Sequence, residues 1–211
     1  RIRNAAYLSE HLGKIEGSAI ELLELITQLL CLTVINEGKI TVVQERVDLP
    51  ALLDQAINPL QEKARRKGME VQLELADSLS RQEIITDFLK LRQIVRNLVD
   101  NAIKFTHSGS VQVRGDMQGS VLRIQVQDSG IGMEERDLKV IFDRFRQLDG
   151  SQTRSYGGLG IGLNLVENFV KLLQGHVQVE STPGQGSFTV SIPCAGAPRW
   201  SAFQAAAVPA G

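Results

Sequence analysis

The chain has 211 residues, of which 43% are hydrophobic and 22% are charged, a balance that is typical of one or two globular domains and argues against disorder. With 23 basic and 24 acidic residues the formal net charge is -1, so no overall attraction to nucleic acid or to an anionic membrane is expected. Two cysteines, Cys31 and Cys194, are too few for a disulfide framework and favour a reducing compartment. No apolar run reaches the roughly 20 residues that a membrane-spanning helix needs.

The first predicted element is a long helix that begins near the N-terminus. Its apolar residues recur in alternating steps of four and three, at Leu8, Leu12, Ile15, Ala19, Leu22, Ile26 and Leu29. This a/d heptad pattern predicts a helix that packs lengthwise on another helix. Further leucines widen the stripe and favour a helix bundle, while an ordinary amphipathic helix packed on its own domain is the alternative. Residues 36–39, Asn-Glu-Gly-Lys, are expected to end the helix.

Helical and alternating patterns mix between residues 40 and 193. Helices are expected over 50–67, 88–105 and 160–173, with a shorter helical stretch over 133–142. Strands are expected over 71–75, 111–113, 121–126, 177–179 and 188–192. Pairs of strands joined by turns, without strict alternation of strand and helix, predict an α+β fold with the helices on one face of a sheet. Residues 144–158 are expected to form a mobile polar loop, and residues 194–211 a flexible C-terminal tail or linker.

Three polar side chains share one face of the helix expected over 88–105. Asn97, Asn101 and Lys104 are spaced at i, i+4 and i+7. Carboxamide oxygens are hard ligands that suit Mg²⁺, and a lysine one turn further on can reach a phosphate as a point charge. A plain polar helix face explains the same residues without a ligand.

Of the 19 glycines, ten fall between Gly130 and Gly186. Asp128 stands at the end of a strand, where its carboxylate can accept a hydrogen bond from an exocyclic amine such as that of adenine. The glycines that follow let the backbone approach a flat ring, although a plain turn explains them equally well. Residues 157–162, Gly-Gly-Leu-Gly-Ile-Gly, precede a helix, and backbone N–H groups at a glycine-rich helix start form an anion site suited to phosphates. Gly184 and Gly186 are read as a hairpin turn or as a further part of such a site.

In their order and spacing these segments resemble the catalytic ATP-binding domain of bacterial sensor histidine kinases. That domain has the Bergerat (GHKL) ATP-binding fold, which type II topoisomerases, mismatch-repair ATPases and a class of heat-shock chaperones share. The resemblance lies in the N box at 91–106 (LRQIVRNLVDNAIKFT), the G1 box at 128–133 (DSGIGM), the F box at 141–145 (IFDRF), the G2 box at 157–163 (GGLGIGL) and the third glycine motif at Gly184 and Gly186. It implies that residues 40–193 form a two-layer α/β sandwich, with a mixed sheet covered by helices on one face.

Residues 1–39 resemble the second helix of the dimerisation and phosphoacceptor hairpin that precedes the ATP-binding domain in this family. Two such hairpins pair into a dimeric four-helix bundle, in agreement with the heptad pattern. The family's phosphoacceptor motif, a His-Glu pair followed closely by Thr-Pro, occurs nowhere in the sequence. None of His11, His107 and His176 has this context. The acceptor histidine is therefore expected on a helix absent from this chain or on another protein.

The resemblance implies a site for ATP and Mg²⁺. Asp128 would fix the adenine amino group, with Gly130 and Gly132 shaping the base pocket. Asn101 would hold Mg²⁺ with support from Asn97. Lys104 would neutralise the phosphate tail, and Asn97 and Lys104 are the predicted catalytic residues.

A lid over about 134–156 and a phosphate loop complete the site that the resemblance implies. The predicted lid residues are Phe142 and Phe145 as anchors and Arg154 as a phosphate contact. The predicted phosphate-loop residues are Gly158, Leu159, Gly160, Ile161 and Gly162. Leu159 stands where the family usually has Thr, and the last strand is about one residue shorter than usual, which leaves open whether Ser187 or Thr189 faces the base.

The implied activity is transfer of the γ-phosphoryl group of ATP to a histidine. In the ATP-hydrolysing relatives a glutamate that activates water stands where this chain has Asn97, and an amide cannot act as a general base near neutral pH. Hydrolysis is therefore disfavoured, and a Bergerat-type ATPase is the weaker alternative. A degenerate kinase that acts as a regulatory heterodimerisation module is the other alternative.

The expected partners are a second copy of the chain, or another kinase, bound through the N-terminal helix, and the receiver domain of a response regulator. Neither nucleic acid nor direct membrane contact is expected for this segment. A cytoplasmic location is expected, as the soluble portion of a membrane-anchored sensor kinase.

Overall fold

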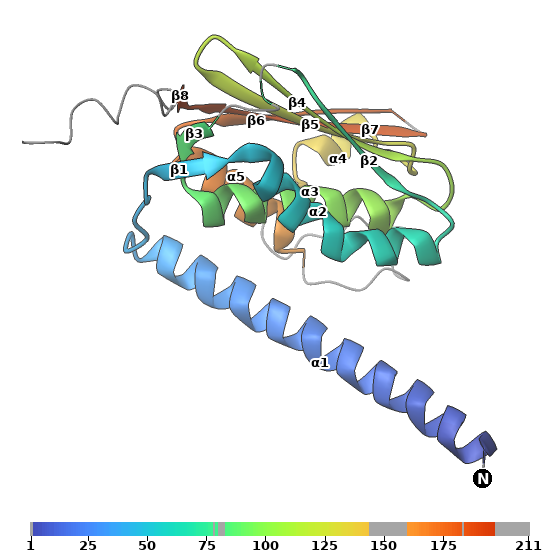
Figure 1. The fold of residues 1–211 in the computed structure, drawn as a ribbon. Coiled ribbons are helices and arrows are strands. Elements are labelled where there is room, and N and C mark those ends of the chain that lie inside the picture. Colours follow the sequence, from blue (N-terminus) through green and yellow to red (C-terminus); the bar gives the residue numbers. More distant parts are fainter. Residues whose placement is uncertain (1, 78, 80–82, 144–159, 183, 197–211) are drawn as a thin grey trace, which may run out of the picture.

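The computed structural model describes residues 2–77, 79, 83–143, 160–182 and 184–196 (Figure 1). The elements are α1 (Ile2–Asn36), β1 (Glu45–Asp48), α2 (Leu49–Arg66), β2 (Val71–Leu75), β3 (Glu83–Thr86), α3 (Phe88–Phe105), β4 (Val111–Gln118), β5 (Val121–Asp128), α4 (Glu135–Leu138), α5 (Gly162–Leu172), β6 (His176–Thr182), β7 (Gln185–Pro193) and β8 (Ala195–Gly196).

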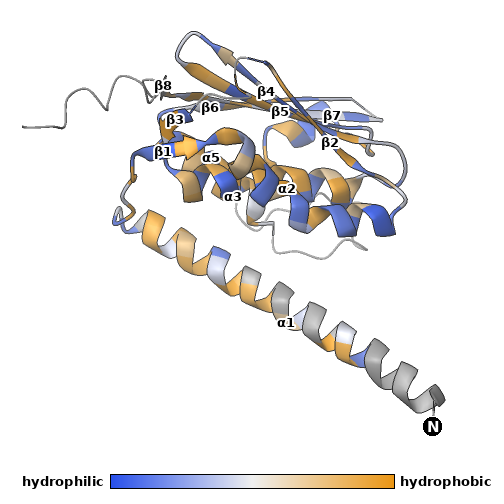
Figure 2. Ribbon diagram, viewed as in Figure 1, coloured by the Kyte–Doolittle hydropathy of each residue, from blue (hydrophilic) through white to orange (hydrophobic). Residues whose placement is uncertain are grey.

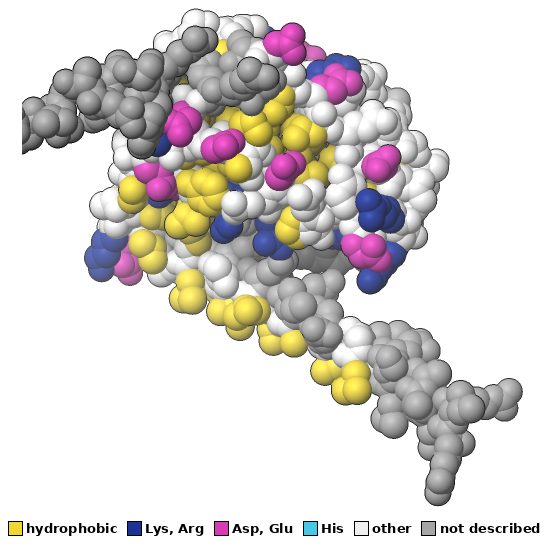
Figure 3. Space-filling view, viewed as in Figure 1, with side chains coloured by type: hydrophobic (Ala, Val, Ile, Leu, Met, Phe, Trp, Pro, Cys, Tyr) yellow, Lys and Arg dark blue, Asp and Glu magenta, His cyan; other side chains and the backbone are white. Residues whose placement is uncertain are grey.

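The N-terminal helix α1 is 35 residues long and projects away from the α/β part of the chain (Figure 1). It ends as predicted, because Gly38 at a φ of 65° turns the chain and donates its N–H to the Ile35 carbonyl (3.0 Å). Much of the described part of α1 is hydrophobic (Figure 2). The large apolar side chains that it leaves exposed (Figure 3) are Leu12, Ile15, Leu22, Leu23, Ile26, Leu29, Leu30 and Val34. Among the described residues, its last turns contact α5, and Leu32 is buried there. None of the helices within the described ranges is long and apolar enough to cross a membrane.

A five-stranded sheet carries the α/β part, in the order β2-β4-β5-β7-β6. The pair β2 and β4 is parallel and the other three pairs are antiparallel, so the sheet is mixed. Helices α2, α3 and α5 lie together on one face of this sheet (Figure 1). The predicted two-layer α/β sandwich is therefore confirmed.

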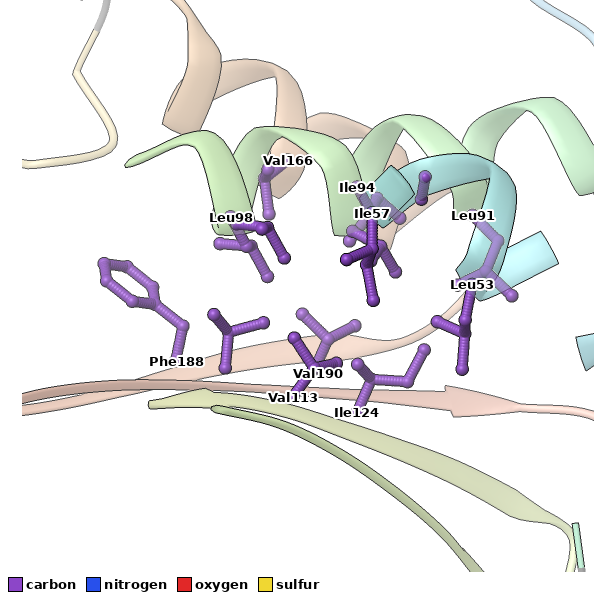
Figure 4. Packing of buried hydrophobic residues seen from close by; sticks show 14 of the residues in the cluster. Leu53, Ile57, Leu91, Ile94, Leu98, Val113, Ile124, Val166, Phe188 and Val190 are labelled. Carbon is purple, nitrogen blue, oxygen red and sulfur yellow. The ribbon is translucent and has the colours of Figure 1, made fainter. Parts of the chain in front are cut away.

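The core lies between the sheet and these helices (Figure 4). Side chains alternate along a strand, so every second residue of the central strands, such as Val113, Ile124 and Val190, faces the helices. These meet the buried faces of the helices, to which Leu53 and Leu98 belong. Burying each such side chain contributes about 1.5 to 3 kcal/mol, which explains why the helices cover this face alone.

Three short strands were not predicted from the sequence. They are β1, β3 and β8, and they form a second sheet in the order β1-β3-β8. At two to four residues they are too short to show an alternating pattern, and only their pairing defines them. The expected tail is wrong at its start, because Cys194 is buried and β8 pairs with β3.

Two other predicted elements have different lengths. The predicted helical stretch over 133–142 contains only the four-residue helix α4, because the chain then continues in turns in which Val140 and Asp143 donate to the carbonyls three residues before them. The hairpin of β4 and β5 is longer than expected and turns tightly between Gln118 and Val121. The predicted helix over 88–105 matches α3.

Candidate nucleotide-binding site

Helix α3 carries the first group of predicted site residues on the edge that faces the start of α5. Asn97 is buried, with 7% of its surface exposed. Its amide nitrogen donates to the Gly162 carbonyl (3.4 Å), and its oxygen accepts from the Gln93 side chain (3.2 Å). Asn97 therefore fixes the start of α5 against the middle of α3.

Asn101 lies one turn further along α3 and is half-buried. Its side chain makes no hydrogen bond with another described residue, and its carboxamide oxygen is therefore the one on this edge that a ligand could use. A Cβ added at Gly162 would lie 4.0 Å from the Asn101 amide nitrogen and 4.0 Å from Asn97 Cγ. The two amides thus face bare backbone across a short gap, and this donor set fits Mg²⁺, which prefers oxygen ligands.

Lys104 follows on the same edge of α3 and is half-buried. Its Nζ lies 5.1 Å from the centroid of the Phe105 ring. Burial lowers the pKa of the Lys104 ammonium, and the negative charge of Asp100 opposes this shift. A phosphate group beside Lys104 would add to the effect of Asp100 and favour the charged form of this partly buried ammonium.

Asp128 ends β5, and 9% of its surface is exposed. Its Oδ1 accepts the Gly130 N–H (2.9 Å), and no donor among the described residues contacts its Oδ2. Burial raises the pKa of the Asp128 carboxyl, and the hydrogen bond from Gly130 only partly opposes the shift. The structure thus buries a carboxylate that keeps one acceptor oxygen free.

Two glycines from different motifs make room for this carboxylate. A Cβ at Gly186 would lie 2.6 Å from Asp128 Oδ2. A Cβ at Gly130 would lie 2.7 Å from Asp128 Oδ1 and 2.6 Å from the Phe105 carbonyl oxygen. At Gly130 no side chain fits unless the backbone moves, and at Gly186 a side chain would displace the Asp128 carboxylate. The third glycine motif is therefore a wall of the Asp128 site as well as a hairpin turn.

The loop after β5 is held from two sides. The Ile131 N–H donates to the Phe105 carbonyl at the end of α3 (3.2 Å), and the Gly184 N–H donates to the Ile131 carbonyl (3.2 Å). The Met133 N–H donates to the Ser181 hydroxyl on β6 (2.8 Å). The G1 segment is thereby fixed between α3 and the turn that joins β6 to β7.

The described end of the predicted phosphate loop leads into α5. Gly160 has a φ of 68°, a conformation that favours glycine, as does Gly132 in the loop after β5. Ile161 caps α5, and its side chain is buried in the core, so only its backbone can face a ligand. Phe142 is half-buried, and its carbonyl accepts the Asn164 amide (2.8 Å), which ties the F box to α5. The predicted residues Phe145, Arg154, Gly158 and Leu159 lie outside the described residues.

Neither Ser187 nor Thr189 faces the helix side of the sheet, where the free Asp128 oxygen lies. Between them stands Phe188, which points into the core (Figure 4). Neighbouring residues of a strand point to opposite faces, so Ser187 and Thr189 belong to the outer face. The Gln125 amide donates to the Ser187 hydroxyl on that face (3.0 Å).

Lys67 supports the site but was missed in the sequence. Its ammonium donates to the carbonyls of Ile103 (2.7 Å), Lys104 (2.9 Å) and Thr106 (3.2 Å) at the C-terminal end of α3. A cation at this end of a helix satisfies carbonyls that have no partner within the helix. In the sequence Lys67 looks like one more basic residue at the end of α2. Asn164 was missed as well, and its only sequence signal is an amide on the otherwise apolar buried face of α5.

Comparison with known proteins places this site in a family. Residues 86–195, about half of the chain, match the family described as "Histidine kinase-, DNA gyrase B-, and HSP90-like ATPase". The matched segment holds Asn97, Asn101, Lys104, Asp128 and both glycine-rich motifs. The chain belongs to this family.

Several relatives carry sensor-kinase names. The chain is 42% identical over 186 residues to the circadian input-output histidine kinase CikA of Synechococcus elongatus, covering 87% of this chain and 25% of the relative. It is 38% identical over 192 residues to the sensor protein GacS of Pseudomonas syringae pv. syringae, covering 87% of this chain and 21% of the relative. The chain thus spans about a quarter or less of the length of these relatives.

A solved structure shows the same fold. The crystal structure of full-length ShkA in complex with AMPPNP superposes with a TM-score of 0.77 at 29% identity, covering 90% of this chain and 39% of that chain.

Proposed function

We propose that this chain binds ATP with Mg²⁺ and transfers the γ-phosphoryl group to a histidine on a dimerisation hairpin. The observation that carries the proposal is the Asp128 carboxylate, which is buried between Gly130 and Gly186 with one oxygen free. A buried carboxylate without a cation is costly unless a ligand supplies the missing donor. The relatives named as sensor histidine kinases, and the AMPPNP complex of ShkA, support the same nucleotide.

Asp128 accounts for a preference for adenine. Its Oδ1 is already bound to the Gly130 N–H, so Oδ2 is the acceptor for the exocyclic amino group of adenine. Guanine carries a carbonyl oxygen at the corresponding ring position, and two acceptors facing each other repel. The selection rests on hydrogen-bond complementarity in a buried pocket, where an unmatched polar group is expensive.

Asn101 and the start of α5 account for the binding of the phosphates. The free Asn101 carboxamide would hold Mg²⁺, which when bound neutralises part of the phosphate charge. Lys104 supplies a further positive charge from the same edge of α3. Residues 160–162 bring backbone N–H groups at the start of α5 to the same gap, a favourable position for an anion.

Asn97 favours transfer over hydrolysis. Its amide is held between Gln93 and Gly162, and it has no basic group with which to deprotonate water. A histidine imidazole needs no such base, because its unprotonated nitrogen is itself the nucleophile. That nitrogen attacks the γ-phosphorus, the bond from the γ-phosphorus to the β–γ bridging oxygen breaks, and ADP leaves with the electron pair. Phosphoryl transfer of this kind depends on positioning and charge neutralisation, which α3 and α5 provide.

Helix α1 supplies the partner surface in this proposal. Its exposed leucines and isoleucines follow the predicted heptad positions, including Leu12 at 63% and Ile15 at 65% exposed. Such a stripe is stable in water only when another helix covers it. We assign it to the helix bundle of a dimer that presents the acceptor histidine, with the receiver domain of a response regulator as the next phosphoryl acceptor.

Nucleotide titration and a transfer assay test the proposal. We expect calorimetry to show Mg²⁺-dependent binding of ATP and at least tenfold weaker binding of GTP. With γ-labelled ATP, the chain should label a supplied helical hairpin that carries the acceptor histidine. Steady ATP hydrolysis without labelling of the hairpin would overturn the proposed kinase activity and favour an ATPase. Absence of nucleotide binding with retained dimerisation would favour the heterodimerisation module.

A further inference from the structure

The segment that joins α1 to β1, residues 37–44, is fastened to the α/β part by one buried ion pair. Asp87 is 2% exposed and Lys90 is 8% exposed, and their side chains form an ion pair at 2.6 Å. The Lys90 ammonium also donates to the Thr41 carbonyl (2.8 Å). The Asp87 carboxylate also accepts the Val43 N–H (2.9 Å). Both charges therefore bind the backbone of the joining segment.

The side chains of the joining segment hold it less firmly. Thr41 is exposed, and Val43 is 57% exposed. Only Ile40 and Val42 pack partly against the core. The hydrogen bond that Asp87 accepts from Val43 and the one that Lys90 donates to Thr41 are thus the directional contacts that set the path of the chain between α1 and β1.

Stability alone does not account for this pair. Asp87 already serves α3 as its N-cap, accepting the Lys90 N–H (3.0 Å), and an Asn at this position would cap equally well. Replacing a buried ion pair with apolar groups of similar volume is often neutral or stabilising, because two charges must lose their hydration. What neutral groups would not reproduce is the pair of contacts to Thr41 and Val43.

We propose that Asp87 and Lys90 are positioning residues that set the orientation of α1 relative to the nucleotide site. The inference rests on the proposed function, in which a histidine on the bundle that contains α1 must reach the γ-phosphate. The pair touches neither the nucleotide site nor the exposed stripe of α1. It acts on the one covalent connection between them, so it affects transfer within the assembled protein without affecting nucleotide binding.

Hydrogen exchange tests the contact directly. The Val43 amide is protected by Asp87, so this amide should exchange slowly in the wild-type chain. In Lys90→Met, and in the double variant Asp87→Asn with Lys90→Met, exchange of the Val43 amide should rise at least tenfold. Lys90→Arg, which keeps the charge, should restore protection at least in part. The double variant carries no unpaired buried charge and should remain folded. Arg114→Met, which removes an exposed ion pair with Glu74 on the sheet, is the matched control.

A comparison of two acceptors tests the consequence for activity. One acceptor is a separate hairpin that bears the histidine, and the other is a first helix with the histidine, joined to the chain ahead of α1. We expect the double variant to lose at least tenfold in the rate of transfer to the joined helix. Its ATP affinity, and its transfer to the separate hairpin, should stay within twofold of wild type.

Three results separate the possible failures. Unchanged transfer to the joined helix in the double variant would overturn the positioning role. An equal loss with both acceptors, or a loss of ATP affinity, would overturn it as well, because the pair would then act on the nucleotide site. Failure of the wild-type chain to label either acceptor would overturn the proposed function, while the exchange experiment would still decide whether the pair holds the joining segment.

Discussion

Two buried aspartates, Asp87 and Asp128, make an informative comparison because they differ in what surrounds the carboxylate. Asp87 accepts hydrogen bonds from the Lys90 side chain, the Lys90 N–H and the Val43 N–H. Burial raises the pKa of Asp87, but these donors outweigh it, and the pKa lies below its usual value. Asp128 has one backbone donor, and burial keeps its pKa above the usual value.

The difference indicates which carboxylate awaits a ligand. Around Asp87 the chain itself supplies the hydrogen-bond donors that the carboxylate needs, so this carboxylate has a structural role. Around Asp128 the described residues supply one donor and clear space with two glycines, which leaves a place for a donor from a ligand. A buried charge left incomplete costs stability, and functional sites are where such costs are found.

The largest expected effect comes from making Asp128 neutral. In Asp128→Asn the oxygen is expected to keep the Gly130 N–H, which turns the amide NH₂ toward the adenine amino group. Two donors then face each other, and a charge-assisted hydrogen bond worth about 1.5 to 3 kcal/mol is lost. ATP affinity measured by calorimetry should fall by up to about 100-fold. Unchanged affinity would show that Asp128 does not bind the base. Asp54→Asn, at an exposed position on α2, is the control.

A smaller effect is expected from filling the space beside Asp128. Gly186→Ala places a Cβ 2.6 Å from Asp128 Oδ2, so the carboxylate or the last strands must shift. Overpacking of this kind costs about 1 to 3 kcal/mol, which thermal or denaturant unfolding would detect. Gly13→Ala is the control, because nothing lies within 4 Å of the added Cβ. Equal unfolding free energies for Gly186→Ala and wild type would contradict the packing described for this wall.

Removing Lys67 tests how far support for the site extends beyond the groups that touch the ligand. Lys67→Met leaves three carbonyls at the end of α3 without their cation, at a cost of about 1 to 2 kcal/mol. Because the neighbouring Phe105 carbonyl holds Ile131, ATP affinity should also fall by about three- to tenfold. Arg66→Met, which removes an exposed ion pair one residue earlier, is the control. Lower stability with unchanged affinity would limit Lys67 to a structural role.

The smallest expected effect is a gain in stability with a defined pH dependence. The folded-state pKa of Asp128 is raised above the ordinary 3.8, so its ionisation lowers stability as pH rises through that range. Without nucleotide at neutral pH, the free energy of unfolding of Asp128→Asn should therefore be about 1 kcal/mol higher than that of wild type. The difference should disappear below pH 3.8, where both side chains are neutral in both states. A difference that persists there would exclude ionisation as its cause.

The sequence by itself determined the elements whose patterns are long and local. The apolar face of α3 repeats over five turns, and its predicted bounds at 88–105 match the structure. The heptads of α1 likewise predicted a helix that packs on another helix. The glycine cluster after Gly130 predicted that the backbone approaches a ligand closely. Local periodicity and backbone freedom depend on neighbouring residues alone, so they can be recognised in the sequence before the fold is known.

Only the tertiary structure decided which distant residues meet. Gly186 lies against Asp128 because β7 pairs with β5 in the register that joins these two residues. Phe188 faces the core in the same register, and this sends Ser187 and Thr189 to the other face. The hold of Asp87 and Lys90 on Thr41 and Val43 likewise spans more than 40 residues of chain. A shift by one residue in strand pairing would exchange the two faces, and which residue of β5 stands opposite Gly186 is settled only when the two strands pair.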